Sequence, residues 1–220
     1  MLTRNKIYGR VGPSKDVKKI FIFCEGETEV NYFNYFRNFS SNIDIVPIGN
    51  TNTQSDPQKL YENAFLKFFG TNIHKPEFSY REDSGDEVWF VIDTDHWNTG
   101  NKIENLRTNC EQQTNWNVVQ TNPCFELWLF YHFNKTKPLL TEVEKYVSFK
   151  DFVNDKIKGG FNSWKHPIFI QDAIINSEIN YVNVGNQPAI LSTEVFLLAK
   201  TILPFVKDII DQCLKAQTIK

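Results

Sequence analysis

The sequence predicts an α/β fold, with a mostly parallel sheet, helices on both of its faces, and a C-terminal helical region. Strand-like and helix-like segments alternate from residue 18 to residue 133, which is the order of a parallel sheet connected by helices. The first strand-like segment, residues 18–24, is apolar after its two lysines, as is typical of a strand buried on both faces. After residue 134 the strand signals stop.

Four segments are predicted as strands, in this order: Lys18–Cys24, Ile43–Ile48, Glu87–Ile92 and Asn117–Gln120. Pro47 places the end of the second strand near a sheet edge, because proline has no N–H to donate to a neighbouring strand. The fourth strand ends at Asn122-Pro123.

Helices are predicted after each strand, at about residues 28–39, 56–69, 102–114 and 124–133. Thr28 is the expected N-cap of the first. Asp56-Pro57 opens the second, since Asp caps and Pro suits the first helical position. Further helices are predicted at residues 141–157, 168–180 and 192–217, the last capped by Ser192 and kinked by Pro204.

The charges are distributed unevenly along a chain of net charge −2. We expect residues 1–17 to form a flexible basic arm, residues 18–135 to form the main α/β domain, and residues 136–220 to form a helical extension. Residues 20–135 hold 8 basic and 16 acidic residues, which excludes a protein that coats DNA by bulk positive charge. Binding of a nucleic acid would then depend on the arm, on local Lys and Arg, or on a partner.

The cysteines and the apolar runs indicate a cytoplasmic protein. The four cysteines, at positions 24, 110, 124 and 213, form no C-x-x-C pair and are expected to be buried thiols in a reducing compartment. No secretory signal is recognised at the N-terminus. No apolar run approaches the ~18 residues that span a membrane, so no membrane partner is expected.

Acidic residues stand where two of the predicted strands end. Glu25, Glu27 and Glu29 follow the first strand, and Asp93 and Asp95 follow the third. Carboxylates gathered at one sheet edge repel one another and need a cation or raised pKa values. Oxygen-rich sets of this kind suit Mg²⁺ or Mn²⁺. A plainer interpretation is open for each: acidic residues also favour helix starts, and Asp93 and Asp95 would suit a strand end and a helix cap.

The segment from Asn122 to Phe133 adds a further candidate. Glu126 is a lone charge in an apolar helix that opens just after the fourth strand. It points either to solvent or toward the site near Asp93. His132 is interpreted as a partly buried helix histidine, and His96, after the D-x-D, as a weaker candidate for a substrate or metal contact.

These stretches carry a family resemblance. FCEGETE at residues 23–29, VIDTD at 91–95 and NPCFELWLFYHF at 122–133 resemble the RloB family, and the NPCFELW stretch is the most specific of them. The resemblance covers residues 18–133, and NQPAILSTEV at 186–195 is a looser version of the family's Asn-Pro-Ser-Thr segment, which leaves the role of Ser192 and Thr193 open. It implies a Toprim-like, Rossmann-like domain and a part in bacterial defence against phage, including abortive infection.

The resemblance also implies an activity and its residues. It implies a magnesium-dependent nuclease acting on DNA or RNA, with tRNA among the candidate substrates, and a hydrolase gated by a partner ATPase. The catalytic residues would be Glu25, Asp93, Asp95 and Glu126, and the Mg²⁺ or Mn²⁺ ligands Glu25, Glu29, Asp93 and Asp95. Glu25 would serve as a ligand or as the base for the attacking water.

Other functions compete with this one. The main alternative is a non-catalytic subunit that binds a nucleotide or a partner protein, with structural or vestigial carboxylates. A receiver domain is less favoured because it needs a lysine after its fifth strand, and no such lysine is apparent. A haloacid-type phosphatase is also less favoured because it carries its D-x-D after the first strand, where this chain has Glu25-Gly26. Three roles are open for the C-terminal helices: a homodimer surface, a lid, or a cover for the sheet.

Overall fold

The computed structural model describes residues 17–50, 56–94, 97 and 100–218. Its main sheet has the strand order β2-β1-β3-β4-β7. The bounds are β1 Lys18–Cys24, β2 Ile43–Gly49, β3 Glu87–Asp93, β4 Trp116–Asn122 and β7 Ser192–Thr193. The first four are parallel, and β7 pairs antiparallel with β4. The predicted mostly parallel sheet is confirmed, and Pro47 lies in the edge strand β2.

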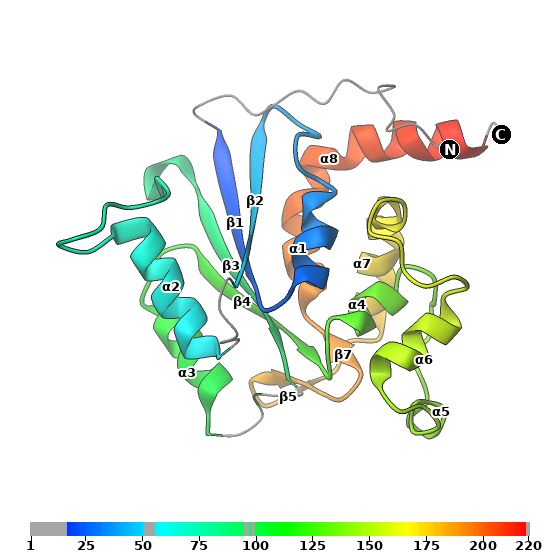
Figure 1. Cartoon of the computed structure of the whole chain (residues 1–220). Coiled ribbons are helices and arrows are strands. Elements are labelled where there is room, and N and C mark those ends of the chain that lie inside the picture. Colours follow the sequence, from blue (N-terminus) through cyan, green and yellow to red (C-terminus); the bar gives the residue numbers. More distant parts are fainter. Residues whose placement is uncertain (1–16, 51–55, 95–96, 98–99, 219–220) are drawn as a thin grey trace.

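Helices cover both faces of this sheet (Figure 1). On one side lie α2 (Pro57–Phe69) and α3 (Lys102–Glu111), and on the other α1 (Glu27–Asn34) and α8 (Val195–Thr218). The strand side chains alternate accordingly. Phe21 and Phe90 pack with α2 and α3, whereas Ile22 and Val91 pack with α1 and α8, because successive strand residues point to opposite faces.

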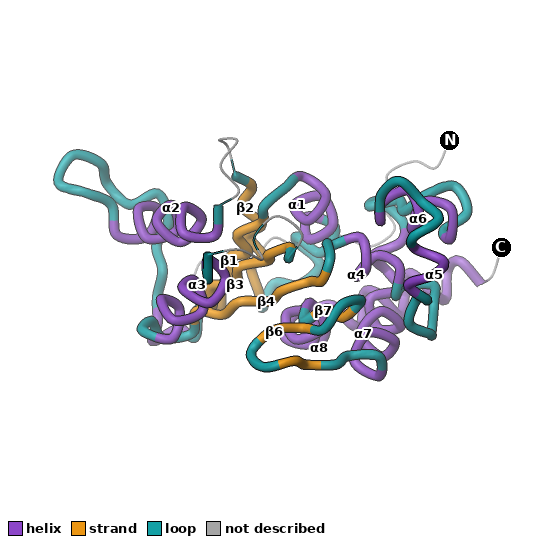
Figure 2. Tube along the Cα trace, turned by 90° about the horizontal axis from the view of Figure 1, so that it is seen from below, coloured by secondary structure: helices purple, strands orange, loops and turns teal. Residues whose placement is uncertain are grey.

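The remaining helices and strands come after β4 in the chain. Their bounds are α4 Glu126–Phe130, α5 Leu140–Val143, α6 Phe149–Lys156, α7 Ile170–Ile179, β5 Asn183–Val184 and β6 Gln187–Pro188, with 3₁₀ turns at Glu82–Ser84 and His166–Phe169. Figure 2 shows α4, α5 and α6 together at one end of the molecule. The prediction that strands stop after residue 134 is wrong, because β5 and β6 form a hairpin and β7 joins the main sheet. Strands of two residues are too short to show a period of two.

Two predicted helix starts are corrected by the structure. The first helix starts at Glu27 with Gly26, and not Thr28, at the N-cap. Ser192 does not cap the last helix but lies in β7, and α8 starts at Val195. Asp56 does cap α2 as predicted, since its carboxylate accepts a hydrogen bond from the Gln58 N–H at 2.9 Å.

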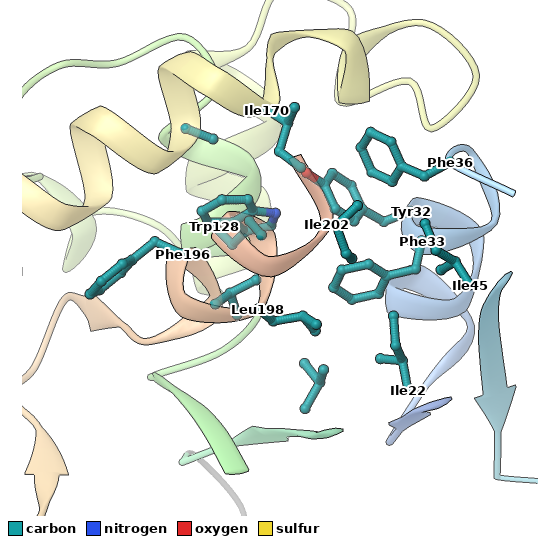
Figure 3. Close-up of a cluster of buried hydrophobic side chains, with 14 of the residues drawn as sticks. Ile22, Tyr32, Phe33, Phe36, Ile45, Trp128, Ile170, Phe196, Leu198 and Ile202 are labelled. Atoms are coloured by element: carbon teal, nitrogen blue, oxygen red, sulfur yellow. The ribbon is translucent and has the colours of Figure 1, made fainter. Parts of the chain in front are cut away.

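The larger hydrophobic core lies between the sheet and the helices α1, α4, α7 and α8 (Figure 3). Ile22 of β1 and Tyr32 and Phe33 of α1 meet Leu198 and Ile202 of α8 in this cluster. Residues far beyond position 135 therefore complete the core of the sheet. Cys24, Cys110 and Cys124 are buried free thiols as expected, and Cys213 is half-buried.

Candidate functional site

The carboxyl ends of β1 and β3 lie side by side and bring Glu25 to Asp93. The two strands pair in parallel, with Cys24 opposite Val91. The Asp93 N–H donates to Glu25 Oε1 at 3.2 Å, and the Trp97 indole N–H donates to Glu25 Oε2 at 3.2 Å. Both oxygens of Glu25 are thus held by donors, and its carboxylate is fixed at the end of β3.

Glu29 lies one turn into α1 and is almost fully buried, with 5% of its surface exposed. Within the described part of the chain its Oε2 atom has no hydrogen-bond partner. The carboxylate folds back over Gly26, where a Cβ atom would lie 3.1 Å from Oε2. Glycine at position 26 therefore makes room for this carboxylate.

Glu126 begins α4 and acts on Glu29 electrostatically. The pKa of Glu29 is raised, first by burial and also by the negative charge of Glu126. The pKa of the Cys24 thiol is raised by burial and by the charges of Glu29 and Glu25. Buried charges are screened little by solvent and salt, so Glu25, Glu29 and Glu126 all influence ionisation at the end of β1.

The structure therefore brings Glu25 to Asp93 at the carboxyl edge of the sheet, places Glu29 over Gly26, and lets the charge of Glu126 act on Glu29. The carboxyl edge is where open parallel sheets bind their ligands. Asp95 and His96 lie outside the described residues. Glu27 is exposed. Among the described residues, no group of three or more His, Cys, Asp or Glu side chains is arranged to hold a metal ion.

His132 joins α1 to the turn that follows α4. Its Nε2 is 3.1 Å from the Tyr32 hydroxyl, and its Nδ1 is 3.0 Å from the Trp128 carbonyl oxygen. The carbonyl can only accept, so Nδ1 carries the proton and Tyr32 donates to Nε2. Burial lowers the pKa of His132 to about 3. His132 is buried more completely than the sequence indicated, and it lies in the turn after α4 and not in a helix.

The sequence reasoning missed a second group of polar residues beside the site. Thr94, Gln120 and Glu194 are buried, and Arg107 forms an ion pair with Glu194 at 2.6 Å. Gln120 did not stand out in the sequence, because β4 also contains Asn117, Thr121 and Asn122. Glu194, directly after Ser192-Thr193, did not stand out because β7 is so short.

Comparison with known proteins gives one match. The family model described as RloB-like protein matches residues 20–202. Neither the curated proteins nor the solved structures contain a match. No helix in the described ranges combines the length and the apolar character needed to cross a membrane.

Proposed function

The chain belongs to the RloB-like protein family, and on that premise we propose that it is a Toprim-type nuclease that cleaves DNA or RNA with Mg²⁺ or Mn²⁺. We place it in the cytoplasm, in bacterial defence against phage and under the control of a partner ATPase. The observation that carries the nuclease proposal is the buried Glu29 carboxylate, whose Oε2 has no hydrogen-bond partner among the described residues. It lies on the helix that follows Glu25, and Glu25 is bonded to the Asp93 N–H.

The carboxylate oxygens at this edge are ligands of the kind that a divalent cation prefers, although no three of the described side chains are arranged to hold one. A buried carboxylate oxygen without a donor is costly, and the charge of Glu126 adds to the cost by raising the pKa of Glu29. A hard cation that prefers oxygen ligands would remove both costs. Glu29 and Asp93 would hold it, together with Asp95. When bound, the metal supplies stabilisation of the charge that develops on the phosphoryl oxygens.

The protein's own residues would then orient the reaction. Glu25 accepts hydrogen bonds from the Asp93 N–H and from Trp97, so it holds the end of β3 in position and keeps a fixed carboxylate beside the site. From there Glu25 serves as a ligand or as the base that takes a proton from the attacking water. The negative charge of Glu126 raises the pKa of Glu29, and a bound cation would offset that effect.

The test is cleavage by the purified full chain. Labelled single- and double-stranded DNA and RNA, including tRNA, are incubated with Mg²⁺ or Mn²⁺. We expect cleavage that falls about 100-fold or more in Asp93→Asn and in Glu25→Gln. Asp83→Asn and Glu27→Gln change exposed carboxylates and should cleave like the wild type. The proposal is wrong if Asp93→Asn cleaves as fast as the wild type.

Expression in cells gives a second readout. Wild-type chain, produced with its partner ATPase, should be toxic and leave cuts in the RNA or DNA pool, whereas Asp93→Ala should be tolerated. Equal toxicity of the two would contradict the assigned role of Asp93.

A non-catalytic binding subunit is the second candidate. It is favoured by the absence, within the described residues, of three ligating side chains arranged around one point. Calorimetry with Mg²⁺ and Mn²⁺ separates the two: no heat of binding at millimolar metal, together with no cleavage, would favour the binding subunit.

A further inference from the structure

A chain of buried hydrogen bonds connects the start of α8 to the end of β3. It begins at Glu194, which is 7% exposed. Glu194 Oε2 accepts from Arg107 Nη2 at 2.6 Å and from the Gln120 N–H at 3.0 Å, and its Oε1 accepts from the Tyr181 hydroxyl at 3.0 Å. Both carboxylate oxygens therefore accept hydrogen bonds, and Oε2 is bonded to the backbone of β4.

Gln120 carries the chain across β4 to β3. Its side chain is fully buried. Its Oε1 accepts from Arg107 Nη2 at 3.1 Å, and its Nε2 donates to Thr94 Oγ1 at 2.8 Å. Arg107 can only donate, so it fixes which end of the Gln120 amide is the acceptor. The amide N–H₂ group is thereby directed at Thr94.

Thr94 is the end of the chain and follows Asp93 directly. Its hydroxyl donates to the Thr121 carbonyl oxygen at 2.8 Å while accepting from Gln120. Its backbone N–H lies 2.9 Å from the carbonyl oxygens of both Thr121 and Pro123. On the other side, the Asp93 N–H is bonded to Glu25. The two backbone N–H groups that flank the Cα of Asp93, those of Asp93 and Thr94, are thus held from opposite sides.

Stability alone does not account for such a chain. Largely buried ion pairs such as Arg107–Glu194, whose side chains are 19% and 10% exposed, are often no more stabilising than apolar residues of similar size. What such a polar network provides instead is a defined geometry, although the buried Arg107 Nε has no hydrogen-bond partner among the described residues. In this protein the network ends at Thr94, directly after Asp93 of the proposed site.

We propose that Arg107, Gln120 and Glu194 are positioning residues that hold Asp93 in its working geometry through Thr94. The inference rests on the proposed nuclease function and adds to it the role of the Ser-Thr-Glu segment at residues 192–194. None of the three needs to touch the substrate. Their effect is expected on the rate of the chemical step, because small displacements of a catalytic group reduce rate steeply.

The test compares Gln120→Leu with Thr94→Ser in the full chain. Gln120→Leu keeps the size of the side chain and removes both of its hydrogen bonds. We expect its kcat to fall at least 10-fold with KM within about twofold of wild type. Thr94→Ser retains the hydroxyl and should keep kcat within about threefold, whereas Thr94→Val, which has the same shape without the hydroxyl, should behave like Gln120→Leu.

A second measurement is independent of cleavage. Hydrogen exchange of the peptide that contains Asp93 and Thr94 should be faster in Gln120→Leu and Thr94→Val, and unchanged in Thr94→Ser, while β1 and α1 exchange as in the wild type. An unchanged kcat in Gln120→Leu overturns the positioning role, whether hydrogen exchange is faster or unchanged.

The two levels of the proposal fail differently. A wild-type chain that neither cleaves nucleic acid nor binds Mn²⁺ overturns the nuclease function and with it the site that the network would serve. A wild-type chain that cleaves, with Gln120→Leu equal to it, overturns the role of the network alone.

Discussion

At the scale of single residues, Glu29 has a buried carboxyl group whose ionised form a cation would stabilise. Burial and the charge of Glu126 raise its pKa, so the folded state disfavours the ionised form. A carboxyl group with a raised pKa in the folded state costs nothing at low pH and destabilises the fold as the pH rises through that pKa.

Glu29→Gln should therefore stabilise the metal-free protein at alkaline pH. We expect the free energy of unfolding to rise by about 1 kcal/mol at pH 8 and to be unchanged at pH 4. Urea denaturation in the presence of a chelator measures it, with the exposed Glu27→Gln as control. With Mg²⁺ added, the wild type should gain stability and the variant should not. A variant less stable than the wild type at pH 8 without metal would contradict the assignment.

His132 gives the opposite pH dependence. Burial lowers its folded-state pKa to about 3, so its contribution is fully present above the ordinary histidine pKa and is lost as the pH falls below it. Between pH 7.5 and pH 5 we expect about 2 kcal/mol of stability to be lost through this residue. In His132→Gln that part of the loss should disappear, whereas in His74→Gln, an exposed histidine, it should remain.

At the scale of elements, the turn from β1 into α1 builds the acidic site. Its sequence, Glu25-Gly26-Glu27-Thr28-Glu29, ends a buried strand and starts a helix within two residues. Glu25 is turned toward β3, and Glu29 is turned back over Gly26. One short turn thus supplies two carboxylates of the proposed site.

Gly26→Ala should impair the site without disturbing the fold. The backbone of Gly26 has φ −135° and ψ 178°, which alanine adopts freely. The added Cβ would lie 3.1 Å from Glu29 Oε2 and would push the carboxylate aside. We expect about a 10-fold or larger loss of cleavage with little change in Tm. Gly49→Ala, whose Cβ would meet a methyl group of Val30 at 3.3 Å, should retain its activity.

At the scale of the whole molecule, the C-terminal third is part of the sheet's own core. Ile170 and Ala173 of α7 and Leu198, Ile202 and Val206 of α8 are buried in the cluster that contains β1 and α1. The helix α8 bends along its length, as Figures 1 and 2 both show, and it contains Pro204.

A chain ending at residue 135 should therefore fail to fold. This truncation removes α7, α8 and β7, and it would expose one apolar face of β1, β3 and β4 to water. Each large core side chain left in water costs about 1.5–3 kcal/mol of stability. Circular dichroism and urea denaturation are expected to show no cooperative transition. A truncated chain that unfolds cooperatively would show that residues 18–135 are an independent domain.

The sequence by itself determined the order of the first four strands and helices, the edge position of β2 and the strand ends at which Glu25 and Asp93 lie. Local signals carry this information: apolar runs, Pro47, and the cap at Asp56. Only the tertiary structure decided that β7 pairs with β4, that Glu29 is buried, and that Arg107 reaches Glu194 across 87 positions of sequence. A two-residue strand has no period to detect, and contacts between distant residues depend on how the helices pack.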